Sequence, residues 1–203
     1  MITLAFVSQK GGAGKSTIAA NIAAYAASNG IKTAVIDLDQ QASISAWHGA
    51  RQDDSIHLIP SHPPLLAKYV AQCEAQDYQL CIIDTPPHNS TAAANAISVA
   101  NLTIVPVRPS AFDLVAAQAT FDLLAQNGGK GGAVINAVPS GTKVIDDATK
   151  FVADAGIKVI GRTGQRIAYQ HATTRGQGVT EYESSGRAAD EIRELWTTIE
   201  GMI

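Results

Sequence analysis

The sequence predicts an α/β protein with a single doubly wound, mostly parallel sheet that carries helices on both faces. Short apolar runs of strand type alternate with helical segments along the whole chain. These runs are continuous in Val, Ile and Leu, as expected for strands that are buried on both faces. A glycine-rich loop also lies between the first strand and the first helix, which is the setting of phosphate-binding loops.

The expected elements follow one another in a regular order over a single domain, residues 1–203. The first strand spans 1–8, and the alanine-rich helix after the loop spans 16–27 and stops at Asn29-Gly30. Further strands are expected at 31–37, 56–60, 80–84, 102–107, 132–138 and 157–160. Further helices are expected at 65–75, 91–99, 114–126, 145–155 and 187–199, and the glycine-rich segment 127–132 is interpreted as a loop within the domain.

Composition excludes several classes of protein. A net charge of -3 argues against a protein that binds nucleic acid over its whole surface, although it allows a local basic patch. No run of 18 apolar residues and no basic leader precede or interrupt the strands, so the expected compartment is the cytoplasm. Cys73 and Cys81 fit neither a zinc site nor a disulfide scaffold and are expected to be buried thiols.

The loop from Gln9 to Thr17 contains two lysines where a phosphate loop needs one. Its second half, Gly14-Lys15-Ser16, fits the usual pattern, whereas Gln9 stands where the pattern has its first glycine. The backbone N–H groups of such a loop and the start of the next helix bind phosphate oxygens. We therefore expect Lys15 to reach the β- and γ-phosphates and Ser16 to hold Mg²⁺; the alternative is a glycine-rich turn that binds nothing.

Carboxylates follow two of the expected strands. Asp84 ends an apolar strand, which is the Walker-B arrangement for orienting Mg²⁺. Asp37 and Asp39 end another strand and face the same side of it, so one can face the metal and the other the water that attacks the γ-phosphate. The alternative for each is an acidic residue that opens a solvated turn. Ser8-Gln9 and Asn136 also end strands, at the edge where such sheets bind ligands.

These motifs together resemble the ParA/MinD family of deviant Walker ATPases, a group of P-loop NTPases. The matching segments are Lys10–Thr17, Asp37–Ser43 with Trp47, Ile83–Pro87, Pro106–Ser110 with Asp113-Leu114, Asn136–Ser140 and Gly178–Tyr182. They cover nearly the whole chain, and the resemblance is greatest to the small ParA-like partition ATPases that lack a helix-turn-helix domain. Gln40 departs from the family, which often has proline after the second aspartate, and this puts the local turn in doubt.

The resemblance implies an ATPase with ATP and Mg²⁺ as cofactors, and it implies a role for each matching residue. Lys10 would reach across an ATP-sandwich homodimer to the partner's phosphates, and Asp39 would orient the attacking water. Asp37 would help near the metal, and Asn136 would contact adenine. The nucleotide-binding set is Gly11, Gly12, Ala13, Gly14, Lys15, Ser16, Thr17 and Asn136, the catalytic set is Lys10, Lys15 and Asp39, and the metal set is Ser16, Asp37 and Asp84.

Three outputs of such a switch compete. A MinD-like membrane switch needs a basic amphipathic helix, but 190–200 carries four acidic residues and one arginine. A reductase on the same scaffold needs cluster cysteines at the dimer seam, where Cys73 and Cys81 are badly placed. A DNA-binding cargo positioner is favoured, because 155–180 lacks Asp and Glu yet is basic; an ordinary solvated face is the alternative. The candidate contacts are Lys158, Arg162, Arg166, Arg175 and Arg187.

The favoured output implies three partners and no membrane. They are a second copy of the chain, non-specific double-stranded DNA of the nucleoid, and a ParB-like or other small adaptor that stimulates hydrolysis. The cargo would be a plasmid or a protein organelle such as a carboxysome.

Overall fold

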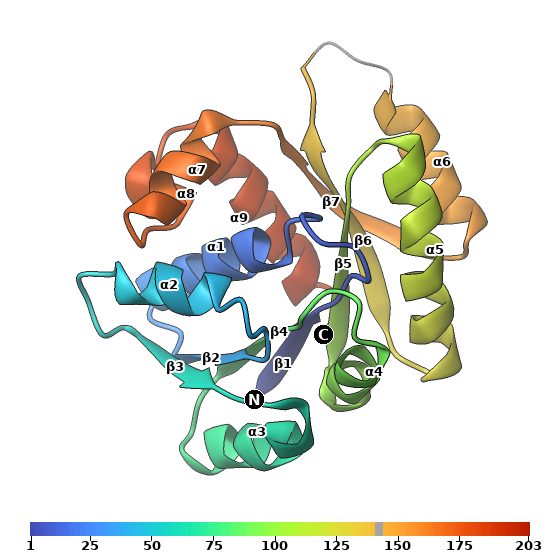
Figure 1. The fold of residues 1–203 in the computed structure, drawn as a ribbon. Coiled ribbons are helices and arrows are strands. Elements are labelled where there is room, and N and C mark those ends of the chain that lie inside the picture. The colour runs from blue at the N-terminus through green and yellow to red at the C-terminus, as the bar shows by residue number, and fades with distance from the viewer. Residues whose placement is uncertain (141–143) are drawn as a thin grey trace.

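The computed structural model describes residues 1–140 and 144–203, and its seven strands form one sheet in the order β3-β2-β4-β1-β5-β6-β7 (Figure 1). All neighbouring strands pair in parallel, which confirms the predicted doubly wound sheet. The strands are β1 (Ile2–Phe6), β2 (Thr33–Asp37), β3 (Ile56–Pro60), β4 (Leu80–Asp84), β5 (Leu102–Val107), β6 (Gly131–Val138) and β7 (Lys158–Gly164).

Six helices confirm predicted segments to within a few residues. They are α1 (Lys15–Ser28), α3 (Leu66–Ala75), α4 (Ser90–Val99), α5 (Ala111–Gln126), α6 (Val144–Asp154) and α9 (Arg187–Glu200). Three short helices and one 3-10 turn were not predicted: α2 (Ser43–Gly49), α7 (Ile167–Thr174), α8 (Val179–Tyr182) and Pro63–Leu65. Neither α2 nor α7 starts with a side-chain cap, and α2 is entered through Ala42 at a φ of 54°, so the usual sequence signal for a helix start is missing.

Alternate residues of the strands pack into separate hydrophobic cores on the two faces of the sheet. Leu4, Phe6 and Ile82 pack against one layer of helices, formed by α1, α2, α7, α8 and α9. Ala5 and Ile83 point the other way, toward a layer formed by α3, α4, α5 and α6. This alternation is the period-two geometry of a strand, and it explains why strands buried on both faces read as unbroken apolar runs.

The carboxyl ends of the central strands bring the predicted site residues to one edge of the sheet. Asp37 and Asp84 are direct partners in the register between β2 and β4, and Phe6 at the end of β1 is the partner of Asp84 on the other side. The chain leaves β1 into the glycine-rich loop at this edge and returns as α1 (Figure 1). Ligands of open α/β sheets bind at such an edge.

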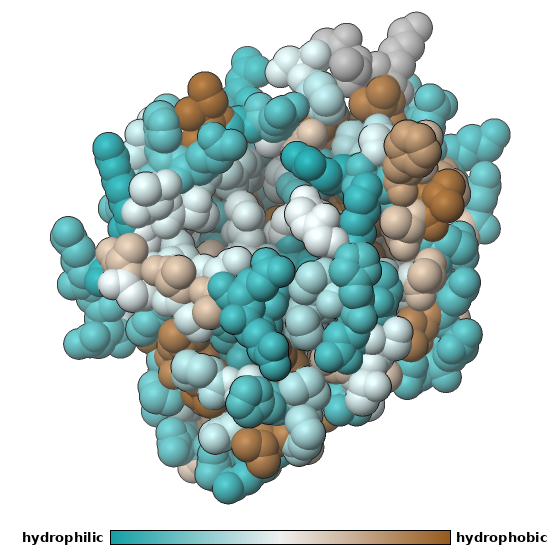
Figure 2. Space-filling model, viewed as in Figure 1, coloured by the Kyte–Doolittle hydropathy of each residue, from teal (hydrophilic) through white to brown (hydrophobic). Residues whose placement is uncertain are grey.

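Helix α9 packs its apolar face against the protein core. Ile192, Leu195 and Trp196 are buried in the core that α9 shares with α1 and β7. In the described part of the chain no helix combines the length and apolar character needed to cross a membrane. The face shown in Figure 2 is largely hydrophilic, and hydrophobic atoms show at its edge over α5, the helix on which Phe112 and Val115 are 85% and 70% exposed.

Candidate nucleotide-binding site

Lys15 is the buried cation of the glycine-rich loop. Lys15 is only 6% exposed, and its Nζ lies 3.5 Å from the carbonyl oxygen of Ser8, just after β1. Burial lowers the pKa of the Lys15 ammonium, and the charges of Asp84 and Asp39 partly offset this. A charge held in so dry a position interacts strongly with an anion that enters the loop. The position fits the predicted contact with nucleotide phosphates.

Gly14 and Asn136 form a tight contact that holds the loop. Gly14 has a φ of +103°, and a Cβ there would lie 2.0 Å from the Asn136 side-chain nitrogen. The Asn136 amide donates to the carbonyl oxygen of Ala13 at 2.6 Å, and its oxygen accepts the Thr163 hydroxyl at 2.6 Å. Asn136 therefore braces the loop from the end of β6, a role that was not predicted. Its contact with adenine stays a prediction.

Ser16 and Asp84 form the part of the site that fits a divalent cation. The Ser16 hydroxyl donates to Asp84 Oδ2 at 2.6 Å, and Asp84 is fully buried. Its other oxygen, Oδ1, has no hydrogen-bond partner, although a buried carboxylate oxygen without one is costly. Burial raises the pKa of Asp84 to about 7, and the Ser16 bond and the Lys15 charge oppose that rise. A hydroxyl beside an unpaired carboxylate oxygen is a donor set that suits Mg²⁺.

Asp37 lies beside Asp84 but has different hydrogen-bond partners. Its Oδ2 accepts the hydroxyl and the backbone N–H of Ser45, at 2.5 and 3.2 Å, and its Oδ1 accepts the backbone N–H of Asp39 at 3.0 Å. Asp37 thus fixes the turn that presents Asp39 and anchors the start of α2. No group of three His, Cys, Asp or Glu residues within 1–140 and 144–203 is placed to hold a metal. A cation here would rely on Ser16, Asp84 and the oxygens of the nucleotide, and the metal role of Asp37 stays a prediction.

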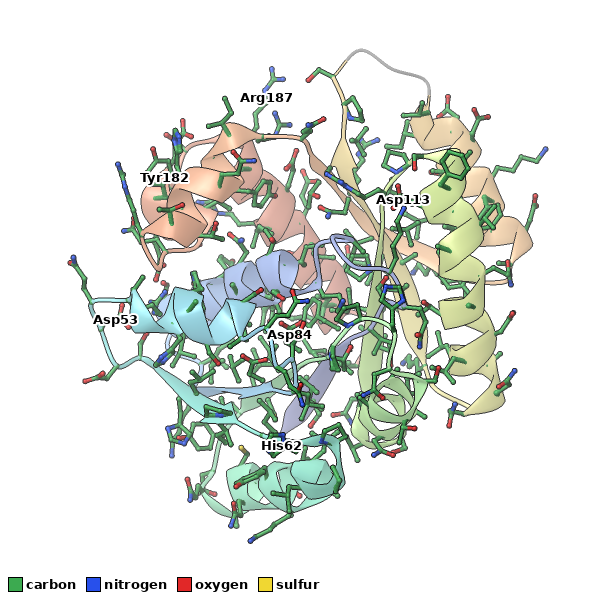
Figure 3. The ribbon with its side chains drawn as sticks, in the orientation of Figure 1. Asp53, His62, Asp84, Asp113, Tyr182 and Arg187 are labelled. Carbon is green, nitrogen blue, oxygen red and sulfur yellow. The ribbon has the colours of Figure 1, made fainter. Side chains whose placement is uncertain are left out.

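Lys10 points away from the cradle that holds Lys15. Its Nζ forms an ion pair with Asp113 Oδ1 of α5 at 2.5 Å, and its side chain is 37% exposed. The other oxygen of Asp113 accepts the Ser110 hydroxyl at the start of α5. The ion pair lowers the pKa of the Asp113 carboxyl despite its partial burial. The two lysines of the loop therefore occupy different environments, and Figure 3 shows Asp113 on α5, well to one side of Asp84.

Two arginines of the predicted basic stretch have acidic neighbours from other elements. Arg166 donates through Nε and Nη2 to Glu191 of α9, at 2.9 and 2.6 Å. Arg162 lines a cleft of about 380 Å³ whose other charged residues are Asp146, Glu191 and Glu194. These acidic residues come from α6 and α9, outside the acid-free segment. Arg162, Arg175, Arg187 and Lys158 are all exposed.

Two side chains of the site were not assigned a role from the sequence. Asp113 holds Lys10, and Ser45 holds Asp37. The sequence contains a signal for the first, because Ser110 and Asp113 have the spacing of residues that cap a helix start. For Ser45 the sequence offers no comparable signal, since α2 itself was not predicted. Both cysteines are buried and free, as expected, at positions in α3 and β4.

Comparisons with known proteins identify the family. The profile of the CobQ/CobB/MinD/ParA nucleotide-binding domain matches residues 4–181. The chromosome-partitioning ATPase Soj of Thermus thermophilus is 30% identical over 140 residues, which span 55% of this chain and 56% of Soj. The maintenance of carboxysome distribution protein A of Halothiobacillus neapolitanus is 26% identical over 210 residues, which span 95% of this chain and 94% of that protein.

Solved structures share the fold. The cell division ATPase MinD of Pyrococcus furiosus superimposes with a TM-score of 0.83 at 19% identity, over 100% of this chain and 99% of MinD. An ATP complex of McdA from Cyanothece superimposes with a TM-score of 0.80 at 17% identity, over 98% and 95% of the two chains. The buried Lys15 and the Ser16–Asp84 pair are consistent with the nucleotide-binding domain that the family profile describes. The chain belongs to the CobQ/CobB/MinD/ParA nucleotide-binding family and contains an ATPase domain of the ParA/MinD kind.

Proposed function

We propose that the protein is an ATP-dependent dimerising ATPase that binds DNA without sequence specificity and positions or segregates a cargo. The observation that carries this proposal is the contrast between the two loop lysines. Lys15 is buried beneath its own loop, whereas Lys10 lies outside it against Asp113 and is partly exposed. A cation that does not serve the phosphates of its own loop is available to those of a second copy.

Hydrolysis follows from the arrangement at the strand ends. With nucleotide bound, Lys15 would neutralise charge on the β- and γ-phosphates, and Ser16 and Asp84 would hold Mg²⁺, which would supply further neutralisation of the phosphate oxygens. Asp39 would orient the attacking water; it lies on the turn just beyond Asp37 and is less buried than Asp37. Asp37 keeps that turn in place through the backbone N–H of Asp39. Positioning of this kind accounts for most of the catalysis in phosphoryl transfer.

Dimerisation completes the site. In a two-fold dimer each Lys10 exchanges Asp113 for the phosphates bound to the partner, so both sites form at once. The exchange is feasible energetically, because the Lys10 side chain is 37% exposed and solvent screens its attraction to Asp113. ATP then stabilises the dimer by adding charge that Lys10 can reach, and hydrolysis removes that charge.

DNA binding rests on the exposed basic residues. Arg175, Arg187 and Lys158 can contact phosphates, whereas Arg166 is engaged by Glu191 and Arg162 faces carboxylates. A dimer doubles the number of phosphate contacts, so its affinity exceeds that of the monomer and falls steeply with salt. No feature of the described residues points to base recognition, and we expect non-specific binding to nucleoid DNA in the cytoplasm.

Cargo positioning is supported by the names of the relatives, which include a chromosome-partitioning ATPase and a carboxysome-distribution protein. Cargo of this class is a plasmid, a chromosome region or a protein organelle. A ParB-like or other small adaptor would stimulate hydrolysis and release the dimer from DNA.

A membrane-associated switch is the second candidate, and the likeness in fold to MinD favours it. A membrane-binding helix must offer an apolar face to lipid. Helix α9 instead buries Ile192, Leu195 and Trp196 in the core, so within the described residues it has no such face to offer. Co-sedimentation with anionic lipid vesicles in the presence of ATP separates the two candidates, since a DNA-binding dimer stays in the supernatant.

Lys10→Ala provides the test of the proposed function. We expect this variant to bind ATP nearly as well as the wild type but to form no dimer with ATP and Mg²⁺ in size-exclusion chromatography with light scattering. Lys150→Ala, which removes an exposed lysine of α6, is the matched control and should dimerise normally. A Lys10→Ala protein that still forms ATP-dependent dimers on DNA contradicts the proposal.

A further inference from the structure

Helix α2 is attached at its start to the carboxylates of the nucleotide site. Ser45 on its first turn donates its hydroxyl and its backbone N–H to Asp37 Oδ2. Just before the helix, the backbone N–H of Ala42 donates to the carbonyl oxygen of Asp39 at 2.8 Å. A displacement of Asp37 or Asp39 therefore displaces the first turn of α2.

The other end of α2 is attached to the turn between α7 and α8. Trp47 donates through Nε1 to the carbonyl oxygen of Gln177 at 3.2 Å. Arg51, just beyond the helix, donates to the carbonyl oxygen of Gly176 at 2.9 Å. Its guanidinium carbon also lies 5.2 Å from the centre of the Trp47 ring. Both residues thus bind main-chain oxygens of the same turn.

A buried ion pair strengthens this attachment. The Arg51 side chain is only 2% exposed and pairs with Glu181 of α8 at 2.8 Å. Glu181 in turn accepts the backbone N–H of Gly178 at 2.8 Å, so it also fixes the start of α8. Removing one member of a buried pair leaves the other charge without compensation, which keeps the two in contact. Asp53 is a second partner of Arg51 but is more than half exposed.

The main chain at Gly176 packs closely against the main chain at Arg51. This residue has a φ of +67°, and a Cβ on it would lie 2.3 Å from the backbone nitrogen of Arg51. The two backbones therefore approach each other too closely for any side chain at position 176. Arg175 precedes Gly176 in the same turn; it is exposed, and its guanidinium carbon lies 4.9 Å from the centre of the Tyr182 ring.

The same turn is tied to the phosphate loop by a second route. Asn21 of α1 is fully buried, donates to the carbonyl oxygen of Thr17 at 2.8 Å and accepts the backbone N–H of Val179 at 2.7 Å. Figure 1 shows α2 beside α1, and α7 and α8 also lie next to α1. The α7–α8 turn thus contacts elements that come from both parts of the nucleotide site, the loop helix and the segment with Asp39.

We propose that Arg51 and Trp47 are positioning residues that make the α7–α8 turn, and with it Arg175, respond to the nucleotide. When Asp39 and Asp37 adjust to ATP, α2 carries the displacement to the main chain at Gly176 and Gln177. The DNA-contacting arginine is then presented in one geometry with ATP and in another without it. This inference rests on the proposed function, in which ATP fills the loop and DNA is the ligand of Arg175.

Amide hydrogen exchange tests the coupling without DNA. The exchange of peptides covering 175–182 is compared with and without Mg²⁺ and a non-hydrolysable ATP analogue. We expect the nucleotide to slow exchange at least about fivefold in the wild type, the lower end of measured couplings between sites. Arg51→Gln should abolish this difference while the affinity for the analogue stays within about twofold. Arg193→Gln, which removes an arginine of α9 paired with Asp190, is the matched control and should keep it.

The outcomes separate coupling from support of the fold. A purely structural role for Arg51 would speed exchange in both states and leave their ratio unchanged. A ratio that survives in Arg51→Gln, or that is absent from the wild type, overturns the inference. Trp47→Phe keeps a six-membered aromatic ring but removes the five-membered ring of the indole with its Nε1 donor, so it serves as the test variant if Arg51→Gln does not fold, and we expect a reduced ratio.

DNA binding is then measured separately. We expect Arg51→Gln to lose most of the ATP-dependent gain in DNA affinity. If the exchange ratio responds to ATP and to Arg51→Gln but the wild type binds no DNA at low salt, the coupling stands and the DNA-binding function is refuted. If DNA binds but the exchange ratio does not respond, the coupling is refuted alone.

Discussion

The glycine-rich loop and the basic stretch 155–180 are both conspicuous in sequence, and the structure gives their charged residues different surroundings. The loop residues Lys15 and Ser16 meet Asp84, a partner that lies at the end of a neighbouring strand. In the basic stretch, Arg166 is paired with Glu191 and Arg162 lies among carboxylates from other helices. Parallel strands bring their ends to a common edge, whereas no local rule states which helix surface will cover a given arginine. The nucleotide site is thus specified by the topology of the sheet, whereas the surroundings of the basic residues depend on how the helices pack.

The largest expected effect concerns the buried carboxylate of the loop region. Asp84→Asn should stabilise the nucleotide-free protein by a few kcal/mol at pH 8, as an order-of-magnitude estimate from its pKa of about 7. The folded-state pKa is raised, so the stability that Asp84 contributes is present below about pH 4 and is lost as the pH rises through 7. The gain of the variant over the wild type should therefore be larger at pH 8 than at pH 5. Thermal unfolding at both pH values checks this, and an equal gain at both would refute the role of burial.

Lys15→Ala should weaken ATP binding about 100-fold, because charged hydrogen bonds to phosphate contribute about 1.5–3 kcal/mol each. Titration calorimetry with the nucleotide measures the change. Lys10→Ala is the internal comparison, and its ATP affinity should change little, since Lys10 is bound to Asp113 outside its own loop. Equal losses in the two variants would mean that both lysines serve the same nucleotide.

The basic stretch is tested by splitting it into two sets. Arg175→Ala with Arg187→Ala should lower the DNA affinity of the ATP-bound protein about tenfold and reduce the slope of log affinity against log salt by about two. Arg162→Ala with Arg166→Ala should change the slope by less than one, because Arg166 is paired with Glu191 and Arg162 shares a cleft with three acidic residues. Fluorescence anisotropy with a labelled duplex at several salt concentrations gives both slopes. An equal change of slope in the two double variants would mean that all four arginines contact DNA as a single patch, as the sequence indicates.

Asp113→Asn should have the smallest effect. It removes a partly exposed ion pair with Lys10, whose strength is about 0–1 kcal/mol. We expect the ATP concentration needed for half-maximal dimerisation to fall by a fewfold, because Lys10 no longer exchanges one partner for another. Asp122→Asn, elsewhere on α5, is the matched control. A rise in the required ATP concentration would mean that Asp113 orients Lys10 for the dimer instead of retaining it.

The part of the structure that could be predicted is the part specified by short-range pattern. Strand ends at Asp37, Asp84 and Asn136 were predicted and meet at one edge, because unbroken apolar runs indicate parallel strands. The pairing of Lys10 with Asp113 and of Arg51 with Glu181 could not be predicted, because each joins residues far apart in sequence. The brace between Asn136 and Ala13 was missed for the same reason. Helix α2 was missed because it is short and lacks a side-chain cap.

The central claim is that ATP assembles two copies through Lys10 into a dimer that binds DNA. The most direct measurement is sedimentation velocity of the Asp39→Ala protein with Mg²⁺, ATP and a labelled duplex of arbitrary sequence. The account predicts that a protein dimer sediments with the duplex at low salt, and that added Lys10→Ala or raised salt abolishes the complex. A monomer that leaves the duplex free at low salt would contradict it.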